Sequence, residues 1–226
     1  MTRSLGLIPA RIGSKRLKEK NIKILNGKPL LAYTIEAAVK SGLSDVVVST
    51  DSDVIAEIAK QFGAQVPFIR PNSISDDVST NKRVLAHAVS FLEEQYSKKY
   101  DLLFVLQPTS PIRKGKHIDE CINLLANSEY DTLASVYGPI KKNQKTIKTM
   151  SSAGELLDYR EGALCEYYTY NGSIYGSKRD FFMQTLNYHM GRQVGYIMDK
   201  LHSVDVDDEF DFEIASHLLN KFGQIE

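Results

Sequence analysis

The alternation of short apolar runs with amphipathic segments constrains the fold of this chain more than any other feature of its sequence. Runs that predict buried strands lie at 5–9, 46–49, 102–106 and 132–136. Apolar residues at helical spacing predict helices at 29–40, 54–62, 82–94, 118–126 and 210–222. Strands that alternate with helices form parallel sheets covered on both faces. We therefore expect an α/β fold with a Rossmann-like, open, twisted and mostly parallel sheet flanked by helices.

The rhythm changes after Tyr137, where Gly138-Pro139 precedes a lysine-rich stretch and then a tyrosine-rich one. This composition predicts hairpins and a small excursion from the sheet at about 138–190. The length of 226 residues fits one domain of generous size. We therefore expect a single domain over 1–226 that includes the excursion.

Charge and cysteine content narrow the function classes. Lys and Arg together number 28, as do Asp and Glu, so the formal net charge is zero. This balance argues against a general binder of nucleic acids or anionic membranes, and no run approaches the ~18 apolar residues of a membrane span. Cys121 and Cys165 lie far apart and in no CxxC pair, which favours buried free thiols over a zinc site and fits a reducing compartment. We expect a soluble cytoplasmic protein.

The loop after the first predicted strand is rich in cations. Against the single acidic residue Glu19 it has five basic ones, Arg11, Lys15, Arg16, Lys18 and Lys20. Gly13 lets backbone amides approach a ligand closely. Ligands of open α/β sheets lie beyond the carboxyl ends of strands, and arginine combined with lysine suits the shifting charge of a triphosphate. The sequence therefore favours a phosphate site over a solvated basic loop, although the Walker A spacing is absent.

Gln107 follows the predicted strand at 102–106, so its amide projects from the same edge of the sheet toward the basic loop. The alternative is an amide at a helix start, because Pro108 and Pro111 follow it. Thr109 and Ser110 have side chains typical of caps for the next helix. Gln107 is therefore a candidate for contact with a ligand bound at the loop.

Two Asp-x-Asp patterns are candidate metal sites. Asp205 and Asp207 alternate with valines, and residues two apart on an extended segment face the same side. Magnesium prefers one or two carboxylates together with water and substrate phosphates, so this pair has the right form. The alternative is a helix cap at Asp207 or, with a stronger pattern, at Asp208. For Asp51-Ser52-Asp53 we favour a cap of the following helix by Asp51 or Asp53 over a metal site.

Several motifs together resemble those of the acylneuraminate cytidylyltransferases, the CMP-sialic acid synthetase family, in its nonulosonic acid branch. They follow the family order over nearly the whole chain: Pro9-Ala10-Arg11-x-Gly13-Ser14-Lys15-Arg16 with Lys20-Asn21, Ser49-Thr50-Asp51, Arg70-Pro71, Gln107-Pro108-Thr109-Ser110-Pro111-Ile112-Arg113, Asn171-Gly172-Ser173-Ile174-Tyr175, and Ser203-Val204-Asp205-Val206-Asp207-Asp208-Glu209-Phe210-Asp211. Each motif alone is weak to moderate evidence, whereas the ordered set is specific.

The resemblance implies that the anomeric hydroxyl of a nine-carbon 2-keto sugar acid attacks CTP, which gives a CMP-sugar and pyrophosphate. The acid would be an N-acylneuraminate or a relative such as legionaminate. Mg²⁺ is implied at Asp205 and Asp207, and a homodimer at the excursion. Catalytic roles are implied for Arg11, Lys15, Lys20 and Gln107, and nucleotide contacts for Ala10, Arg11, Gly13, Ser14, Lys15, Asn21, Arg70 and Thr80.

Sugar contacts are implied for Gln107, Asn171 and Tyr175, but the chain departs from the family pattern just before Asn171. Thr169 stands where family members often have an arginine, and Arg160 lies near the place of an upstream Arg-Gln pair. Arg160 is the nearest replacement for the carboxylate clamp, and its alternative is a surface arginine. Two further functions stay open, a cytidylyltransferase for the eight-carbon acid Kdo and a metal-dependent glycosyltransferase that uses Asp51-Ser52-Asp53.

Overall fold

A computed structural model describes residues 2–14, 16–75, 80–139, 147–158 and 167–222. The strands are β1 Ser4–Pro9, β2 Ile24–Leu25, β3 Lys28–Pro29, β4 Asp45–Ser49, β5 Leu102–Leu106, β6 Thr132–Tyr137, β7 Ile147–Met150, β8 Leu156–Asp158, β9 Tyr167–Lys178 and β10 Gln193–Met198. The α-helices are α1 Leu30–Val39, α2 Asp53–Gln61, α3 Asn81–Tyr96, α4 Gly115–Ala126, α5 Arg179–Thr185 and α6 Glu209–Phe222. Each strand and helix predicted above is present, with ends that differ by at most three residues.

The main sheet has the strand order β10-β6-β9-β5-β1-β4. β1 pairs in parallel with both β4 and β5, and β10 pairs in parallel with β6, whereas β9 runs antiparallel between β5 and β6. The predicted α/β class with an open, mostly parallel sheet is confirmed.

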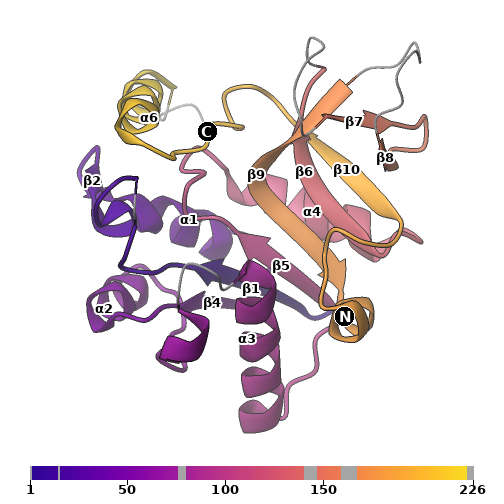
Figure 1. Cartoon of the computed structure of the whole chain (residues 1–226), viewed down its shortest axis with the longest axis horizontal. Helices are drawn as coiled ribbons and strands as arrows, with labels where there is room; N and C mark the ends of the chain where they lie inside the picture. The colour runs from indigo at the N-terminus through magenta and orange to yellow at the C-terminus, as the bar shows by residue number, and fades with distance from the viewer. Residues whose placement is uncertain (1, 15, 76–79, 140–146, 159–166, 223–226) are drawn as a thin grey trace.

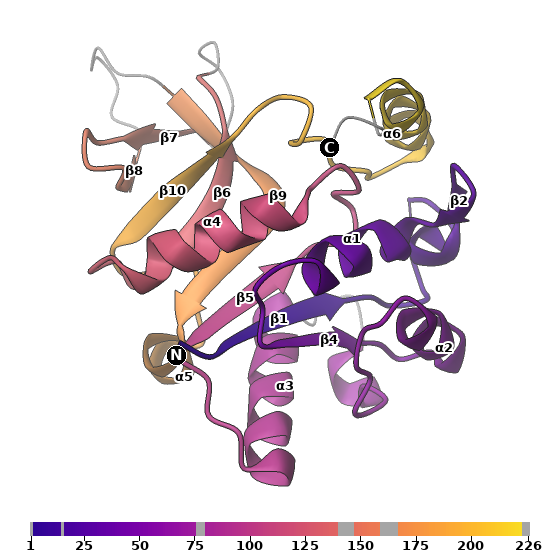
Figure 2. The same ribbon diagram turned by 180° about the vertical axis from the view of Figure 1, so that it is seen from behind.

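Helices cover both faces of the sheet. α1 and α4 lie on the face toward the viewer in Figure 2, and α3 lies on the opposite face, in front of the sheet in Figure 1. The buried side chains agree, because Leu31 and Ile118 pack with Phe104 in one cluster and Val84 packs with Leu103 in another. Alternate residues of β5 thus point to opposite faces, as a strand buried on both sides requires.

The segment 138–190 differs in extent from the predicted excursion. β7 and β8 form a hairpin that joins the sheet through pairing of β7 with β9, whereas β9 itself lies inside the main strand order and contributes buried residues such as Ile174. Small residues allow this close packing, since a Cβ on Gly176 would lie 2.7 Å from the Phe104 ring. β9 is rich in glycine and serine and lacks the β-branched pattern typical of a strand, so the sequence did not predict this central strand.

The last helix packs against the amino-terminal part of the chain, and Figure 1 shows α6 close to β2 and α1. A third buried cluster joins them and contains Leu17, Leu25, Leu30, Val206, Phe212 and Ala215. Of the predicted apolar face of α6, Phe212 and Ala215 are buried, whereas Ile214 is exposed. The packing brings the segment before α6 to the loop after β1, although these segments are far apart in sequence.

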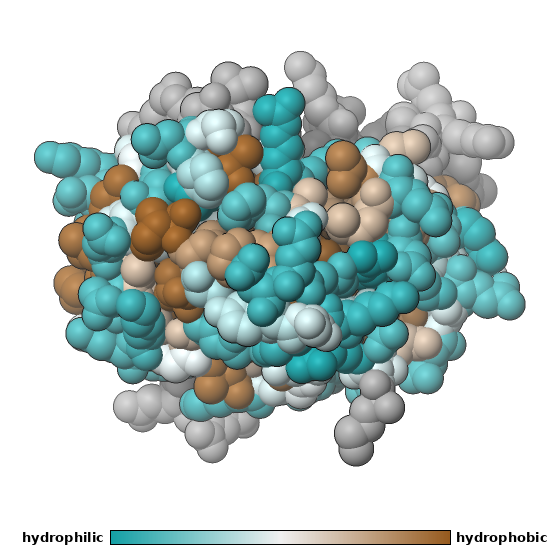
Figure 3. All heavy atoms as spheres, turned by 90° about the horizontal axis from the view of Figure 1, so that it is seen from below, coloured by the Kyte–Doolittle hydropathy of each residue, from teal (hydrophilic) through white to brown (hydrophobic). Residues whose placement is uncertain are grey.

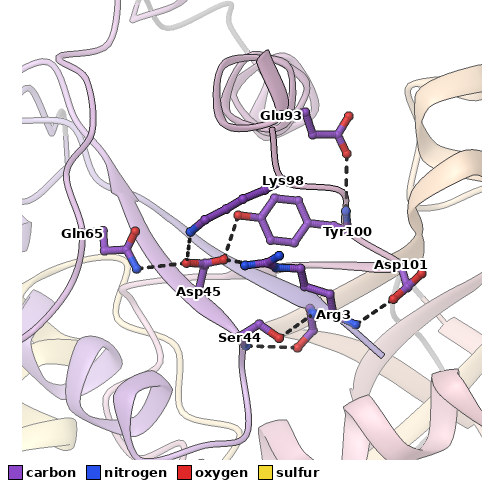
Figure 4. A network of polar contacts seen from close by, with 9 residues as sticks. Arg3, Ser44, Asp45, Gln65, Glu93, Lys98, Tyr100 and Asp101 are labelled. Atoms are coloured by element: carbon purple, nitrogen blue, oxygen red, sulfur yellow. Dashed lines mark hydrogen bonds and ion pairs between the residues drawn. The ribbon is translucent and has the colours of Figure 1, made fainter. Parts of the chain in front are cut away.

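The amino ends of the strands are closed by a network around the buried Asp45 (Figure 4). Its carboxylate accepts hydrogen bonds from Lys98 Nζ at 2.6 Å, Tyr100 Oη at 3.0 Å and Gln65 Nε2 at 3.1 Å. Burial alone raises the pKa of Asp45, but these hydrogen bonds lower it below its ordinary value. The network stabilises this end of the sheet and leaves the carboxyl ends of the strands for a ligand.

The cysteine, the helices and the surface can be compared with the sequence predictions within the described residues. Cys121 is buried and free, as expected, and burial raises its pKa, while Cys165 lies outside the described residues. In the described ranges, no helix has the length and apolar character that a membrane span needs. On the face drawn in Figure 3, hydrophilic side chains predominate and hydrophobic ones gather in patches between them.

His117 in α4 should make stability depend on pH. Its ring is 6% exposed, and burial, with His202 and Lys116 nearby, lowers its pKa to about 4. The unfolded chain, with a histidine pKa near 6.5, therefore binds more protons below that pH, so stability falls as the pH drops from about 6.5 toward 4. Between pH 7 and pH 5 we expect a loss of about 2 kcal/mol from this group.

Urea unfolding followed by circular dichroism at both pH values measures this loss. His117→Asn keeps an acceptor for the Lys114 N–H, which His117 Nδ1 accepts at 3.2 Å, and should lose less stability at pH 5 than the unmodified chain. His217→Asn, at an exposed position of α6, is the control. An equal loss in the unmodified chain and in His117→Asn would refute the assignment.

Candidate active site

A cavity of about 560 Å³ opens at the carboxyl ends of β1 and β5. β1 lies between β4 and β5, so the chain leaves it toward one neighbour and later returns to its other side. Such a reversal of strand order opens a crevice where α/β proteins bind ligands. The cavity is lined by Pro9, Arg11, Ser14, Arg16, Leu17, Lys20, Asn21, Arg70, Ile74, Ser75, Asn81, Val84, Gln107, Pro108, Thr109 and Asp207.

The loop after β1 is held in place by its own polar residues. Asn21 Nδ2 donates to Arg11 O at 2.8 Å, and Asp51 Oδ1 accepts from Ile12 N at 3.0 Å. The predicted cap of α2 by Asp51 or Asp53 is therefore wrong, because Ser52 is the N-cap and accepts from Ile55 N. Asp51 instead fixes the loop, a use that also counts against a metal site there.

Four of the predicted cations, Arg11, Arg16, Lys20 and Arg70, line the cavity. Arg70 is 5% exposed, and its Nε donates to Ser75 Oγ at 3.2 Å. Burial lowers the pKa of Arg70, and the neighbouring Arg11 lowers it further, while Asp51 opposes this change. Because the buried Arg70 guanidinium is repelled by a second guanidinium, an anionic ligand beside the two groups would stabilise their charged forms.

The basic loop meets the acidic segment before α6 directly. Arg16 Nη1 lies 2.8 Å from Asp207 Oδ2, and Lys20 Nζ donates to Val206 O at 2.7 Å and lies 3.4 Å from Asp207 Oδ1. Arg16 and Asp207 are 191 positions apart in sequence. The basic loop of the predicted phosphate site and Asp207 of the predicted metal site therefore lie in one place.

Asp205 lies beside Thr109 and Gly172. Burial raises the pKa of its carboxyl group, Thr109 counteracts this through a side-chain hydrogen bond, and repulsion by Asp207 raises the pKa further. Thr109 O also accepts from Val206 N at 2.8 Å. Gly172 has φ +75°, and a Cβ there would lie 3.2 Å from Asp205 Oδ2. Glycine therefore leaves the space at this carboxylate open.

These two carboxylates fit a divalent cation shared with phosphates. No group of three or more His, Cys, Asp or Glu side chains within the described residues forms a metal site by itself. Asp207 lines the cavity and Asp205 is not among its lining residues, but the two carboxylates repel each other, as the protein ligands of a magnesium site that substrate phosphates complete would. The cap of α6 falls on Asp208, as favoured above, because its Oδ1 accepts from Asp211 N at 3.0 Å.

The predicted sugar residues are only partly at the cavity. Gln107 lines it, whereas Asn171 and Tyr175 do not. Asn171 is 7% exposed, its Oδ1 accepts from Ser135 Oγ at 2.6 Å and from Ser173 N at 3.1 Å, and its Nδ2 donates to Ser203 Oγ at 3.0 Å. Tyr175 is buried against Tyr170 and Tyr188. The polar atoms of Asn171 are thus largely committed inside the protein.

The remaining predicted residues occupy varied positions. Ser14 and Asn21 line the cavity, and nothing lies within 4 Å of a Cβ built on Gly13. Ala10 is fully buried and donates its N–H to Ser49 O, so it supports the loop from below. Thr80 is exposed and does not line the cavity. Lys15 and Arg160 lie outside the described residues.

Sequence reasoning missed several cavity residues. The sequence pattern favours a helix cap at Thr109, but α4 begins at Gly115 with Lys114 as its N-cap, so Thr109 is available to Asp205. Arg16 was counted among the cations without a role of its own. Ser75 and Asn81 gave no signal, because each reaches the cavity only through the fold of the segment between β4 and β5.

A family model described as cytidylyltransferase matches residues 5–215 of the chain. An N-acylneuraminate cytidylyltransferase of Escherichia coli O18:K1:H7 is 36% identical over 97% of this chain and 53% of its own length. The CMP-N,N'-diacetyllegionaminic acid synthase of Legionella pneumophila is 32% identical over 96% of each chain. The chain therefore spans about half the length of the first relative and nearly all of the second.

Solved structures agree in fold. A CMP:2-keto-3-deoxy-manno-octonic acid synthetase in complex with CTP superposes with a TM-score of 0.77 at 18% identity, over 97% of this chain and 99% of that one. At this identity the likeness concerns the fold.

Proposed function

Because the chain belongs to the cytidylyltransferase family, we propose that it transfers the CMP group of CTP to a nonulosonic acid and releases pyrophosphate. The acid is an N-acylneuraminate or a relative such as legionaminate, in line with the names of the relatives from Escherichia coli and Legionella pneumophila. The identity to these relatives, 36% and 32%, is higher than the 18% to the octonic acid synthetase, which favours the nine-carbon acids over Kdo.

One observation carries the proposal: the basic loop after β1 and the acidic segment before α6 meet at one cavity, through the contacts of Arg16 and Lys20 with Asp207. A nucleoside triphosphate with a divalent cation needs both charge types at one place. The glycosyltransferase alternative has less support, because Asp51 is bonded to the loop backbone.

The reaction is a displacement at the α-phosphorus of CTP. The anomeric oxygen of the acid forms a bond to phosphorus, the bond to the pyrophosphate oxygen breaks, and the hydroxyl proton passes to solvent. Arg11, Lys15 and Lys20 bind the triphosphate and hold the charge that develops on pyrophosphate, while Gln107 orients the acid. Little acid–base chemistry is required, so positioning and electrostatics carry most of the acceleration.

Cytidylyltransferases of this kind generally use a divalent metal ion, and we assign Mg²⁺ to Asp205 and Asp207. When bound, the ion supplies charge neutralisation at the triphosphate oxygens. Arg16 and Lys20 contact Asp207 in the structure, and Arg16 is 72% exposed, so this side chain can turn from Asp207 toward a phosphate.

A pyrophosphate-release assay tests the function. The purified protein is incubated with each nucleoside triphosphate, Mg²⁺ and a panel of 2-keto sugar acids with eight or nine carbons. We expect release only with CTP together with a nine-carbon acid, and the panel identifies which acid. Release with Kdo alone, or transfer from a preformed sugar nucleotide without pyrophosphate, contradicts the proposal.

We also propose a single 1–226 domain that functions as a homodimer. β10 is an edge strand of the main sheet, and Ile197 on it and Leu157 on the adjacent β8 are 48% and 44% exposed, which supports an interface there. Light scattering should give twice the mass of one chain for the unmodified protein. Ile197→Lys should give the mass of a single chain. A monomer at every concentration up to that of the assay rejects the dimer.

A further inference from the structure

Arg113 is a buried cation between β5 and α4. It is 3% exposed, its Nη1 donates to Ser173 O at 2.6 Å, and its Nη2 donates to Thr34 Oγ1 at 2.7 Å. Nη2 also lies 3.3 Å from Gln107 O. Within the described part of the chain, no carboxylate forms an ion pair with it. The guanidinium is therefore held by neutral oxygens from three segments.

Such a group is unfavourable for stability alone. A buried charge without a counter-charge loses its hydration, and an apolar side chain of similar size is often as stable or more so. Burial lowers the pKa of Arg113 to about 9, and the Cys121 thiol only partly opposes this. Its Nε has no hydrogen-bond partner among the described residues. What it provides is the planar fork, which reaches several carbonyls at once in a way lysine cannot.

The carbonyls that Arg113 binds belong to residues that carry the candidate site. Ser173 O also accepts from Gln107 N at 3.3 Å, so it joins the end of β5 to β9. Ser173 N donates to Asn171 Oδ1, and Asn171 Nδ2 donates to Ser203 Oγ. This series of hydrogen bonds from Thr34 through Arg113, Ser173 and Asn171 to Ser203, here called the Arg113 ladder, runs from α1 to the segment that carries Asp205.

We propose that Arg113 is a positioning residue, which fixes Gln107 and the Asn171-Gly172 turn so that the acid faces the triphosphate. The inference rests on the proposed function. It also gives Asn171 a different role from the sugar contact implied by family resemblance, because its amide is a rung of the ladder. Arg113 itself is not among the residues that line the cavity.

A change at Arg113 should affect the use of the acid much more than the binding of CTP. The cations that face the cavity follow β1 and β4, outside the ladder, so the dissociation constant of CTP should change by less than about 3-fold in Arg113→Lys. Small misplacement of reacting groups lowers rates strongly, so kcat/KM for the acid should fall by about 10- to 100-fold. Thr34→Val, which removes one of the two acceptors of Nη2, should give a smaller loss of the same kind.

Arg179→Lys is the matched control. Arg179 is also partly buried, but it binds Glu93 at the opposite end of the sheet, where its N–H donates to Asp101 O. This variant should melt at a lower temperature with kcat/KM unchanged. The inference would be overturned if kcat/KM were unchanged in both Arg113→Lys and Thr34→Val. It would also be overturned if Arg179→Lys lost as much kcat/KM as Arg113→Lys.

Hydrogen exchange provides a readout that needs no substrate. Backbone amides at 171–174 and at Gln107 should exchange faster in Arg113→Lys than in the unmodified chain, and not in Arg179→Lys. Unaltered exchange rejects the ladder even if activity changes. If the unmodified protein turns over no acid, the proposed function fails, whereas the exchange result still decides whether Arg113 holds these segments.

Discussion

Arg11→Ala should lower pyrophosphate release by about 10³-fold while the melting temperature stays nearly unchanged. Arg11 lines the cavity beside the buried Arg70, and under the proposed function it faces the charge that develops on the leaving pyrophosphate. Loss of one such donor typically has an effect of this size. The loop keeps its shape, because Asn21 binds the backbone carbonyl of Arg11 and not its side chain. Initial rates with saturating acid, together with thermal melting, measure both quantities.

Lys18→Ala is the matched control for Arg11→Ala. It removes one positive charge from the same loop at an exposed position that does not line the cavity, so activity should change by less than about 3-fold. A large loss of stability in Arg11→Ala with normal activity per folded molecule would show that Arg11 is structural. Equal losses of activity in both variants would show that only the net charge of the loop matters.

Asp207→Asn should lower turnover by at least about 100-fold and leave the fold intact. The substitution keeps the shape of the side chain and removes the charge that would meet the metal ion. Asp207 is 51% exposed, and its partner Arg16 is 72% exposed, so their ion pair contributes little to stability. The rate at several Mg²⁺ concentrations measures the effect, and the variant should need more metal than the unmodified protein.

Asp208→Asn removes the same charge one position later. Asp208 caps α6 through Asp211 N, and asparagine caps helices as well as aspartate does, so both stability and turnover should persist. If Asp208→Asn lost as much activity as Asp207→Asn, the metal assignment would be replaced by a general need for negative charge before α6.

Local patterns predicted β1, β4, β5 and β6, but they missed the central antiparallel strand β9 and the parallel edge strand β10. The runs at 102–106 and 46–48 are apolar throughout because both faces of these strands are buried, and such runs are visible in a sequence. Residues 173–177 of β9 are buried as well, but its Gly176 lies against the Phe104 ring and its Ser173 and Ser177 are buried polar residues. Its partners, far away in sequence, determine this composition, so no local pattern marks it.

The site follows the same division. Arg11, Lys20 and Asp207 were identified because charge and spacing are local features, and the structure brings them to one cavity. Thr109, Asp51 and Arg113 take their roles from partners distant in sequence, respectively Asp205, Ile12 and Ser173. A cap pattern such as that at Asp51 is typical of a helix start, and only the packed fold showed that Ser52 takes that role.

The central claim is that the basic loop and the acidic pair hold the same triphosphate, and calorimetric titration of CTP tests it most directly. The unmodified protein and Asp207→Asn are each titrated with CTP, once in buffer that contains Mg²⁺ and once in buffer that contains EDTA. We expect Asp207→Asn to weaken CTP binding in Mg²⁺ and to leave it unchanged or tighter in EDTA, where the carboxylate only repels the phosphates. Equal CTP affinities of the two proteins in Mg²⁺ would contradict the account.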